Sequence, residues 1–122
     1  MDYPKALLLM SKEMQREFSP AASKAQTEWI GVETCCQARA ALAKNPDTAV
    51  VISNQTLQDG NWCCIFGELV QRNLAANLVV IVPVGCDTSV IQSYGVFGVL
   101  RSPLEASAAD VIAEAAHAPH AM

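Results

Sequence analysis

The sequence has few features that would let it bind nucleic acid or cross a membrane. Eight Lys and Arg residues stand against twelve Asp and Glu, which gives a net charge of −4, and the basic residues form no cluster that would neutralise a row of phosphates. No apolar run approaches the roughly 18 residues of a membrane-spanning helix. The apolar run at residues 6–10 is too short for a secretory signal. We therefore expect a cytoplasmic protein that binds neither nucleic acid nor membranes.

The sequence also lacks the cysteine spacings of a thioredoxin-like motif or a zinc site, because no C-x-x-C occurs among its five cysteines, Cys35, Cys36, Cys63, Cys64 and Cys86. Four of them form two vicinal pairs, and neighbouring cysteines pair poorly with each other because disulfide geometry needs converging side chains. We therefore expect reduced thiols that serve as small, buried apolar residues. The alternative is a thiol sensor, since a helix N-terminus lowers the pKa of a thiol.

Charge is scarce and apolar residues are abundant, at 16% and 52% of the chain, which is typical of a globular protein. The length of 122 residues fits one domain over residues 1–122, with an ordered core at about residues 4–116 and a loose C-terminal tail. His117 and His120 lie in that tail without flanking carboxylates or thiols. We therefore expect no metal site and no cofactor.

Hydrophobic patterning alternates between strand and helix. Continuous apolar runs at residues 6–10, 49–52 and 78–82 predict strands that are buried on both faces. Weaker strands are expected at residues 29–34 and 96–100. Apolar stripes with helical spacing predict helices at residues 61–73, with Trp62 in the stripe that faces the core, and at 104–115, and a shorter one at residues 35–45.

Two further helices are less regular. The first, over residues 14–25, should kink or restart at Ser19-Pro20, and a short one is expected near residues 87–94. Five strands that alternate with five helices predict a three-layer α/β/α fold with a parallel sheet. Its strand order should be 2-1-3-4-5, as in flavodoxin-like proteins.

The stretch from Val50 to Asn61 (VVISNQTLQDGN) resembles the phosphorylation loop of bacterial response-regulator receiver domains. That loop has an apolar strand, an aspartate, two residues, leucine, usually proline, and a turn. Here Leu57 and Asp59-Gly60 match the family, Asn54 stands at the phosphoacceptor position, and Gln58 replaces the proline. The resemblance implies a receiver fold with a degenerate site.

Other positions match the receiver pattern in place but not in chemistry. Met10-Ser11 falls where the family has its acidic pair for Mg²⁺, and Pro83 at a Thr or Ser after the fourth strand. Ser102-Pro103 falls at a Lys-Pro dipeptide that often has a cis bond in the family, and both isomers of Pro103 remain open here. Val99 stands at the aromatic switch position. The resemblance thus implies a vestigial pocket formed by Met10, Ser11, Asn54, Pro83 and Ser102.

A pocket of this composition cannot perform phosphoryl transfer. Mg²⁺ binds to hard oxygen ligands, normally carboxylates together with phosphate oxygens, and an amide such as Asn54 cannot form an acyl phosphate. Without anionic ligands and a metal ion, the charge on a transferring phosphoryl group is not neutralised. A receiver that is active through Asp59 or Asp87 would need a second acidic partner beside either residue, and the alignment offers none.

The resemblance implies a signalling module of a two-component (phosphorelay) system. We expect it to be independent of phosphorylation, to have no enzymatic activity and to act by contact with protein partners. A homodimer through the fourth helix, fifth strand and fifth helix is one such contact, with Tyr94, Phe97 and Val99 as candidate residues. The alternative is a small-ligand or thiol-redox sensor that reuses the vestigial pocket.

Overall fold

A parallel sheet forms the middle layer of the molecule in a computed structural model, which describes residues 3–102 and 108–117. Its five strands are β1 (Lys5–Leu9), β2 (Glu28–Val32), β3 (Val50–Asn54), β6 (Asn77–Pro83) and β7 (Gly98–Ser102). They lie in the order β2-β1-β3-β6-β7, and every neighbouring pair is parallel. Counted along the chain within this sheet, the order is 2-1-3-4-5. The predicted fold class and strand order are confirmed.

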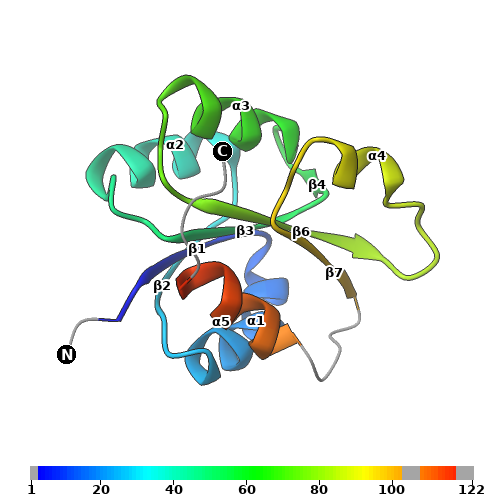
Figure 1. Cartoon of the computed structure of the whole chain (residues 1–122), viewed down its shortest axis with the longest axis horizontal. Helices are drawn as coiled ribbons and strands as arrows, with labels where there is room; N and C mark the ends of the chain where they lie inside the picture. The colour runs from blue at the N-terminus through cyan, green and yellow to red at the C-terminus, as the bar shows by residue number, and fades with distance from the viewer. Residues whose placement is uncertain (1–2, 103–107, 118–122) are drawn as a thin grey trace.

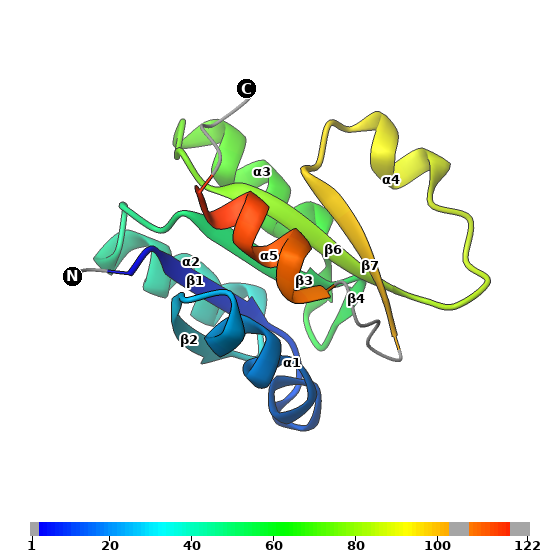
Figure 2. The same cartoon turned by 60° about the horizontal axis from the view of Figure 1, so that its bottom comes forward.

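Helices cover both faces of the sheet (Figure 1). Helices α1 (Lys12–Lys24) and α5 (Ala108–His117) lie on one face, and α2 (Cys35–Lys44), α3 (Cys63–Gln71) and the short α4 (Ser89–Ser93) lie on the other. The turned view in Figure 2 shows the same two layers of helices, with α1 and α5 in front of the sheet. Each layer packs on its own apolar core.

The two cores explain why the strands have continuous apolar sequences. Successive side chains of a strand point to opposite faces, so Leu8 and Ile52 join the core under α1 and α5, whereas Leu7, Val51 and Val80 join the core under α2 and α3. Both sets of side chains are almost fully buried. A strand that is covered on both faces therefore needs apolar residues at every position.

Helix α1 continues through Pro20, so of the kink or restart expected at Ser19-Pro20 the restart does not occur. Pro20 has no N–H to donate to the carbonyl of Arg16. Pro20 and Arg16 are both exposed, and water can therefore satisfy that carbonyl group. The buried side of the helix, with Phe18, Ala21 and Ala22, holds α1 against the sheet.

A small hairpin follows β3 and has no counterpart among the predicted elements. Strands β4 (Thr56–Leu57) and β5 (Gly60–Asn61) pair antiparallel, with Thr56 opposite Asn61 and Leu57 opposite Gly60. Gly60 has a φ of 148°, a value that side chains disfavour. The turn predicted at Asp59-Gly60 is present, and it closes this hairpin.

The predictions for the C-terminal tail and for Pro103 concern residues at or beyond the ends of the described segments. Helix α5 includes His117, so the helical structure reaches one residue beyond the expected core. His120 and the rest of the tail from residue 118 lie outside the described residues, as does Pro103 with its open cis or trans bond. Within residues 3–102 and 108–117, no helix has both the length and the apolar character that a membrane span requires.

Candidate functional site at the strand ends

Met10, at the end of β1, lies in the core. Its side chain is 0% exposed and belongs to the core that packs under α1 and α5. Its N–H donates to the carbonyl of Val32, 3.0 Å away, which ties the end of β1 to the end of β2. The position that matches an acidic residue of receivers is thus occupied by a thioether side chain among apolar neighbours.

Gln15 of helix α1 forms hydrogen bonds with backbone groups at the same end of the sheet. Its Nε2 donates to the carbonyl oxygens of Met10, at 2.9 Å, and Val32, at 3.2 Å. Gly31 makes this possible, because a Cβ at position 31 would collide with the Gln15 amide. The side-chain amide therefore satisfies backbone oxygens where a receiver would hold a metal ion. The sequence analysis did not identify Gln15 or Gly31.

The side chains of Ser11 and Asn54 both form hydrogen bonds with nearby backbone groups. The Ser11 Oγ accepts a hydrogen bond from the N–H of Met14 at 3.2 Å, which caps α1. The Asn54 Nδ2 donates to the carbonyl of Thr56 at 2.9 Å, at the entry to the β4–β5 hairpin. Each side chain completes the element that follows its strand. These hydrogen bonds are the ordinary roles of Ser and Asn at helix starts and turns.

Pro83 and Ser102 end the two neighbouring strands β6 and β7, where they are paired in the sheet register. The carbonyl of Pro83 accepts from the N–H of Cys86 at 3.2 Å. The carbonyl of Cys86 in turn accepts from Nη1 of Arg101 at 3.2 Å. The Arg101 guanidinium thus braces the loop after β6 and is held there by a backbone oxygen.

Both candidate acceptors among the aspartates are also engaged in capping. Asp59 Oδ1 accepts from the N–H of Cys35 at 2.9 Å, and Oδ2 accepts from the N–H of Cys36 at 3.2 Å. These bonds, with that of Cys35 the strongest, hold the pKa of the Asp59 carboxyl below its ordinary value. Asp87 accepts from the N–H of Ser89 at 3.0 Å, which lowers its pKa in the same way. The sequence indicated only a turn residue at Asp59, and it did not predict the contact of Asp59 with the start of α2.

The partner-face candidates Tyr94, Phe97 and Val99 differ in exposure. Tyr94 is 50% exposed and Phe97 37% exposed, whereas Val99 is half-buried against the core under α2 and α3. The Tyr94 ring meets the rings of Trp62 and Phe66 edge to face, at centroid distances of 5.3 and 5.6 Å. Trp62 is buried, as its place in the apolar stripe predicted.

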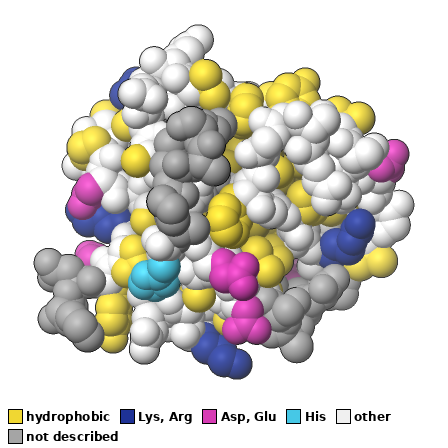
Figure 3. Space-filling view, viewed as in Figure 1, with side chains coloured by type: hydrophobic (Ala, Val, Ile, Leu, Met, Phe, Trp, Pro, Cys, Tyr) yellow, Lys and Arg dark blue, Asp and Glu magenta, His cyan; other side chains and the backbone are white. Residues whose placement is uncertain are grey.

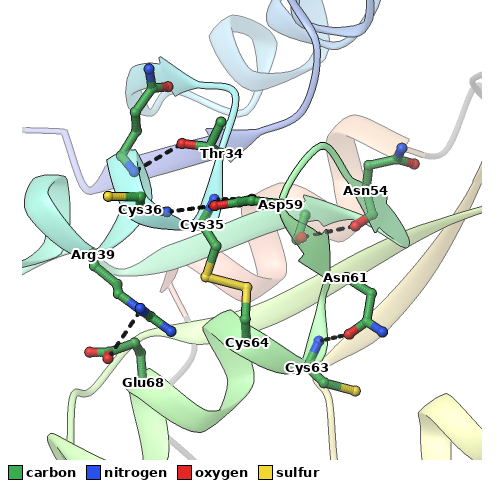
Figure 4. Close-up of a disulfide and its surroundings, with 12 residues drawn as sticks. Thr34, Cys35, Cys36, Arg39, Asn54, Asp59, Asn61, Cys63, Cys64 and Glu68 are labelled. Carbon is green, nitrogen blue, oxygen red and sulfur yellow. Dashed lines mark hydrogen bonds and ion pairs between the residues drawn. A yellow bond between two sulfur atoms is a disulfide. The ribbon is translucent and has the colours of Figure 1, made fainter.

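The cysteines depart from the prediction of reduced thiols. Cys35 at the start of α2 and Cys64 near the start of α3 form a disulfide, which Figure 4 shows between the two helices. The vicinal pairs do not pair internally, as expected, but the fold brings one cysteine of each pair together. Cys36 and Cys63 are free and exposed, and Cys86 is free and half-buried. A prediction from sequence missed this bond because its cysteines are 29 residues apart.

An ion-pair group lies further along the same two helices. Glu68 of α3 accepts from Arg39 of α2 at 3.3 Å and from Arg72 of its own helix. Only 15% of the Glu68 side chain is exposed, against about half of each arginine. Helices α2 and α3 are therefore joined by an ion pair as well as by the disulfide.

A cavity of about 230 Å³ lies on the flank of α1, beside the edge strand β2. It is lined by Lys12, Gln15, Arg16, Ser19 and Trp29, and none of the five predicted pocket positions lines it. Trp29 is 37% exposed there. On the face shown in Figure 3, the Lys and Arg side chains are scattered and form no continuous basic patch, and some lie next to Asp or Glu side chains. In the described part of the chain, no three His, Cys, Asp or Glu side chains converge as a metal site.

Comparison with known proteins gives a fold match without sequence relatives. No protein-family model matches the sequence, and no curated protein is significantly similar to it. The structure, however, matches many solved receiver domains. A response regulator receiver domain from Clostridium thermocellum has a TM-score of 0.79 at 16% identity, over 92% of this chain and 93% of that one.

Two further solved structures agree closely with this match. The receiver domain of NtrX from Brucella abortus has a TM-score of 0.75 at 19% identity, over 92% of this chain and 96% of that one. The signal receiver domain of an HD domain-containing protein from Pseudomonas fluorescens Pf-5 has a TM-score of 0.76 at 15% identity, over 96% and 91%. This chain therefore has the fold of response-regulator receiver domains.

Proposed function

We propose that this chain is a receiver-type module of two-component signalling that works without phosphorylation and without catalysing a reaction. The observation that carries the proposal is the chemistry of the strand ends. Met10 is buried in the core, Ser11 caps α1 and Asn54 bonds to the hairpin backbone. The positions that bind Mg²⁺ and the phosphoryl group in receivers thus hold uncharged side chains that already have local structural roles.

The charge balance of phosphoryl transfer supports the same proposal. An acyl phosphate needs a carboxylate nucleophile, and the transferring group needs a metal ion or another positive charge to offset its own. The two aspartates nearest in sequence to these strand ends, Asp59 and Asp87, are bonded to backbone N–H groups at other places. Any switching of the module would then come from binding, because the usual change in charge is unavailable.

The side of the molecule around α4 supports action through protein contact. Four apolar side chains between residues 84 and 97 are exposed: Val84 and Val90, each 65%, with Tyr94 and Phe97. Such a group is a candidate contact surface because isolated exposed apolar residues are ordinary, whereas a cluster of them is less so. A protein partner or a second copy of the chain would bury these side chains.

The small-ligand alternative has no specific observation in its favour. A ligand pocket is an open cleft or cavity, lined mainly by apolar side chains with a few polar groups that orient the ligand. Met10 is buried, and the amide of Gln15 occupies the backbone oxygens next to it. We therefore propose no ligand for the vestigial pocket.

The proposal is tested by incubating the chain with acetyl phosphate and Mg²⁺ and then measuring its intact mass. We expect the mass to stay unchanged, while a receiver domain with its acidic residues intact, treated in parallel, gains one phosphoryl group. A stoichiometric phosphoryl group on the wild-type chain would contradict the proposal.

The contact surface is tested separately by Val90→Lys, which places a charge on exposed α4. The matched control is Val70→Lys on α3, where the side chain is 51% exposed. Sedimentation velocity over a range of concentrations measures self-association. If the chain forms a homodimer through α4, only Val90→Lys should shift it to monomer. Equal effects of both substitutions would place the contact elsewhere.

A further inference from the structure

The two vicinal cysteine pairs lie at the starts of two neighbouring helices. Cys35 and Cys36 open α2, and Cys63 and Cys64 open α3. Four cross-pairings are conceivable between such pairs, and the fold selects the one between Cys35 and Cys64, whose Cα atoms are 6.5 Å apart. This distance lies within the range that a disulfide spans. In Figure 4 the sulfur atoms of Cys36 and Cys63 point away from the bond.

Burial gives the two bonded cysteines different roles. Cys35 is 3% exposed and belongs to the core under α2 and α3, whereas Cys64 is half-buried at the margin of that core. A reagent in solution therefore reaches the sulfur of Cys64 before that of Cys35. The Cys64 sulfur lies in the first turn of α3, where the helix dipole stabilises a thiolate.

Contacts other than the disulfide also hold the starts of α2 and α3. Arg39 and Glu68 join α2 to α3 by an ion pair. Asp59 holds the start of α2 through the N–H groups of Cys35 and Cys36 and not through their sulfurs. A reduced Cys35 would remain a small apolar side chain in the core. None of these contacts requires the bond between the two sulfurs.

We propose that Cys35 and Cys64 form a reversible thiol–disulfide couple that responds to low-molecular-weight disulfides such as glutathione disulfide. The thiolate of Cys64 attacks one sulfur of glutathione disulfide, which forms a mixed disulfide and releases one glutathione thiolate. The thiolate of Cys35 then attacks the Cys64 sulfur and releases the second glutathione. The two protons of the protein thiols end on the two glutathione molecules, and the reverse sequence reduces the protein.

Oxidation would tie α2 to α3 by a covalent bond next to the hairpin that Asp59 anchors. The bond closes a loop with a sequence separation of 29 residues. Removing the chain entropy of such a loop from the unfolded state should raise the melting temperature by about 10 °C. This couple does not depend on the proposed signalling role, since it uses neither the strand-end positions nor the surface around α4.

The test uses the full chain in two variants that the vicinal pairs provide. Cys36→Ser with Cys63→Ser changes two exposed residues and keeps the proposed couple, whereas Cys35→Ser with Cys64→Ser removes it. Each folded protein is equilibrated in buffers of different ratios of reduced to oxidised glutathione, quenched with acid and treated with N-ethylmaleimide. Intact mass counts the alkylated thiols, and tryptic mapping finds any link between residues 25–39 and 45–72.

We expect the first variant to lose two alkylatable thiols as the glutathione disulfide fraction rises and to regain both when the ratio is reversed. The link between the two tryptic peptides should appear with the loss, and the melting temperature should rise with it. The second variant should form no link between these peptides. The proposal is overturned if the first variant keeps all its thiols at every ratio, or if its bond neither forms nor opens while the protein is folded. A link of equal yield in the second variant would also overturn it.

Discussion

The strand ends and the space between α2 and α3 have opposite chemical characters. At the strand ends, Met10 is buried and Asn54 is bonded to the backbone. At α2 and α3, in contrast, a disulfide and the half-buried Glu68 join the two helices, and the Asp59 carboxylate of the neighbouring hairpin accepts from two N–H groups at the start of α2 (Figure 4). The disulfide and the Asp59 carboxylate thus lie in the segments that follow β2 and β3, at the starts of α2 and α3, and not at Met10 or Asn54.

This chain has the fold of receiver domains, but its strand ends have uncharged side chains such as Met10 and Asn54. The strand ends of this chain are closed by ordinary structural hydrogen bonds, so the receiver architecture does not depend on the acidic pocket. The contact between α2 and α3 contains the proposed thiol–disulfide couple.

Met10→Asp should have the largest effect, because it places a carboxylate where a side chain is 0% exposed. An unpaired buried charge should lower the free energy of unfolding by about 4 kcal/mol or more. Urea denaturation followed by circular dichroism measures the loss. Met10→Leu, which nearly conserves volume, should lower it by less than about 1.5 kcal/mol. If Met10→Asp changes stability by under about 1 kcal/mol, the side chain reaches water, and the strand ends are open after all.

Gln15→Ala should have an intermediate effect, since it leaves the carbonyl oxygens of Met10 and Val32 without the amide that bonds to both. We expect a loss of about 1–2 kcal/mol in the free energy of unfolding. Gly31→Ala should also destabilise the protein, because its methyl group would displace the Gln15 amide.

The two substitutions should not be additive in the double variant. Once Gln15 is truncated, the methyl group at position 31 has no amide to displace, so it should cost about 1 kcal/mol less than in the wild-type background. A double-mutant cycle from urea midpoints measures this coupling. If the losses in free energy of unfolding are strictly additive, the Gln15 amide does not occupy the space next to Gly31.

Asp59→Asn should have the smallest effect, and that effect should depend on pH. The pKa of Asp59 is lowered by its bonds to the N–H groups of Cys35 and Cys36. Its stabilisation is therefore fully present above the pKa of the unfolded chain and is lost as the pH falls through the lower folded pKa. Wild type should be the more stable protein at neutral pH, and the difference should shrink below about pH 4.

Urea midpoints over that pH range measure the difference. Asp47→Asn is the matched control, because Asp47 is an exposed carboxylate whose ion pair with Lys5 should contribute little. A difference between wild type and Asp59→Asn that stays constant with pH would mean that the carboxylate does not hold the start of α2.

The parts of the fold that the sequence predicts are those with local causes. The run Leu78–Val82 is apolar at every position because β6 is the second strand from its edge and is covered on both faces. Trp62 was placed in the core from the spacing of its helical stripe. Leu57 and Gly60 located the hairpin turn, although the pairing of β4 with β5 was too short to leave a strand pattern.

The parts that the sequence did not predict depend on contacts between distant residues. Cys35 meets Cys64 only because α2 and α3 lie side by side on the same face of the sheet. Asp59 reads as a turn residue until the fold brings it to the start of α2. At the strand ends, the resemblance to receivers identified Asn54, but it did not predict that the Gln15 amide donates to the carbonyl oxygens of Met10 and Val32. Pairings of this kind leave no periodic trace in a single sequence.

The most direct test of the central claim is the phosphorylation of Asn54→Asp. This substitution restores a carboxylate at the phosphoacceptor position but leaves Met10 and Ser11 in place of the acidic pair. After incubation with acetyl phosphate and Mg²⁺, the account predicts no increase in intact mass, because the strand ends still lack ligands for the metal ion. The addition of one phosphoryl group, lost again on hydroxylamine treatment, would contradict the account and show that one substitution is enough to restore the receiver chemistry.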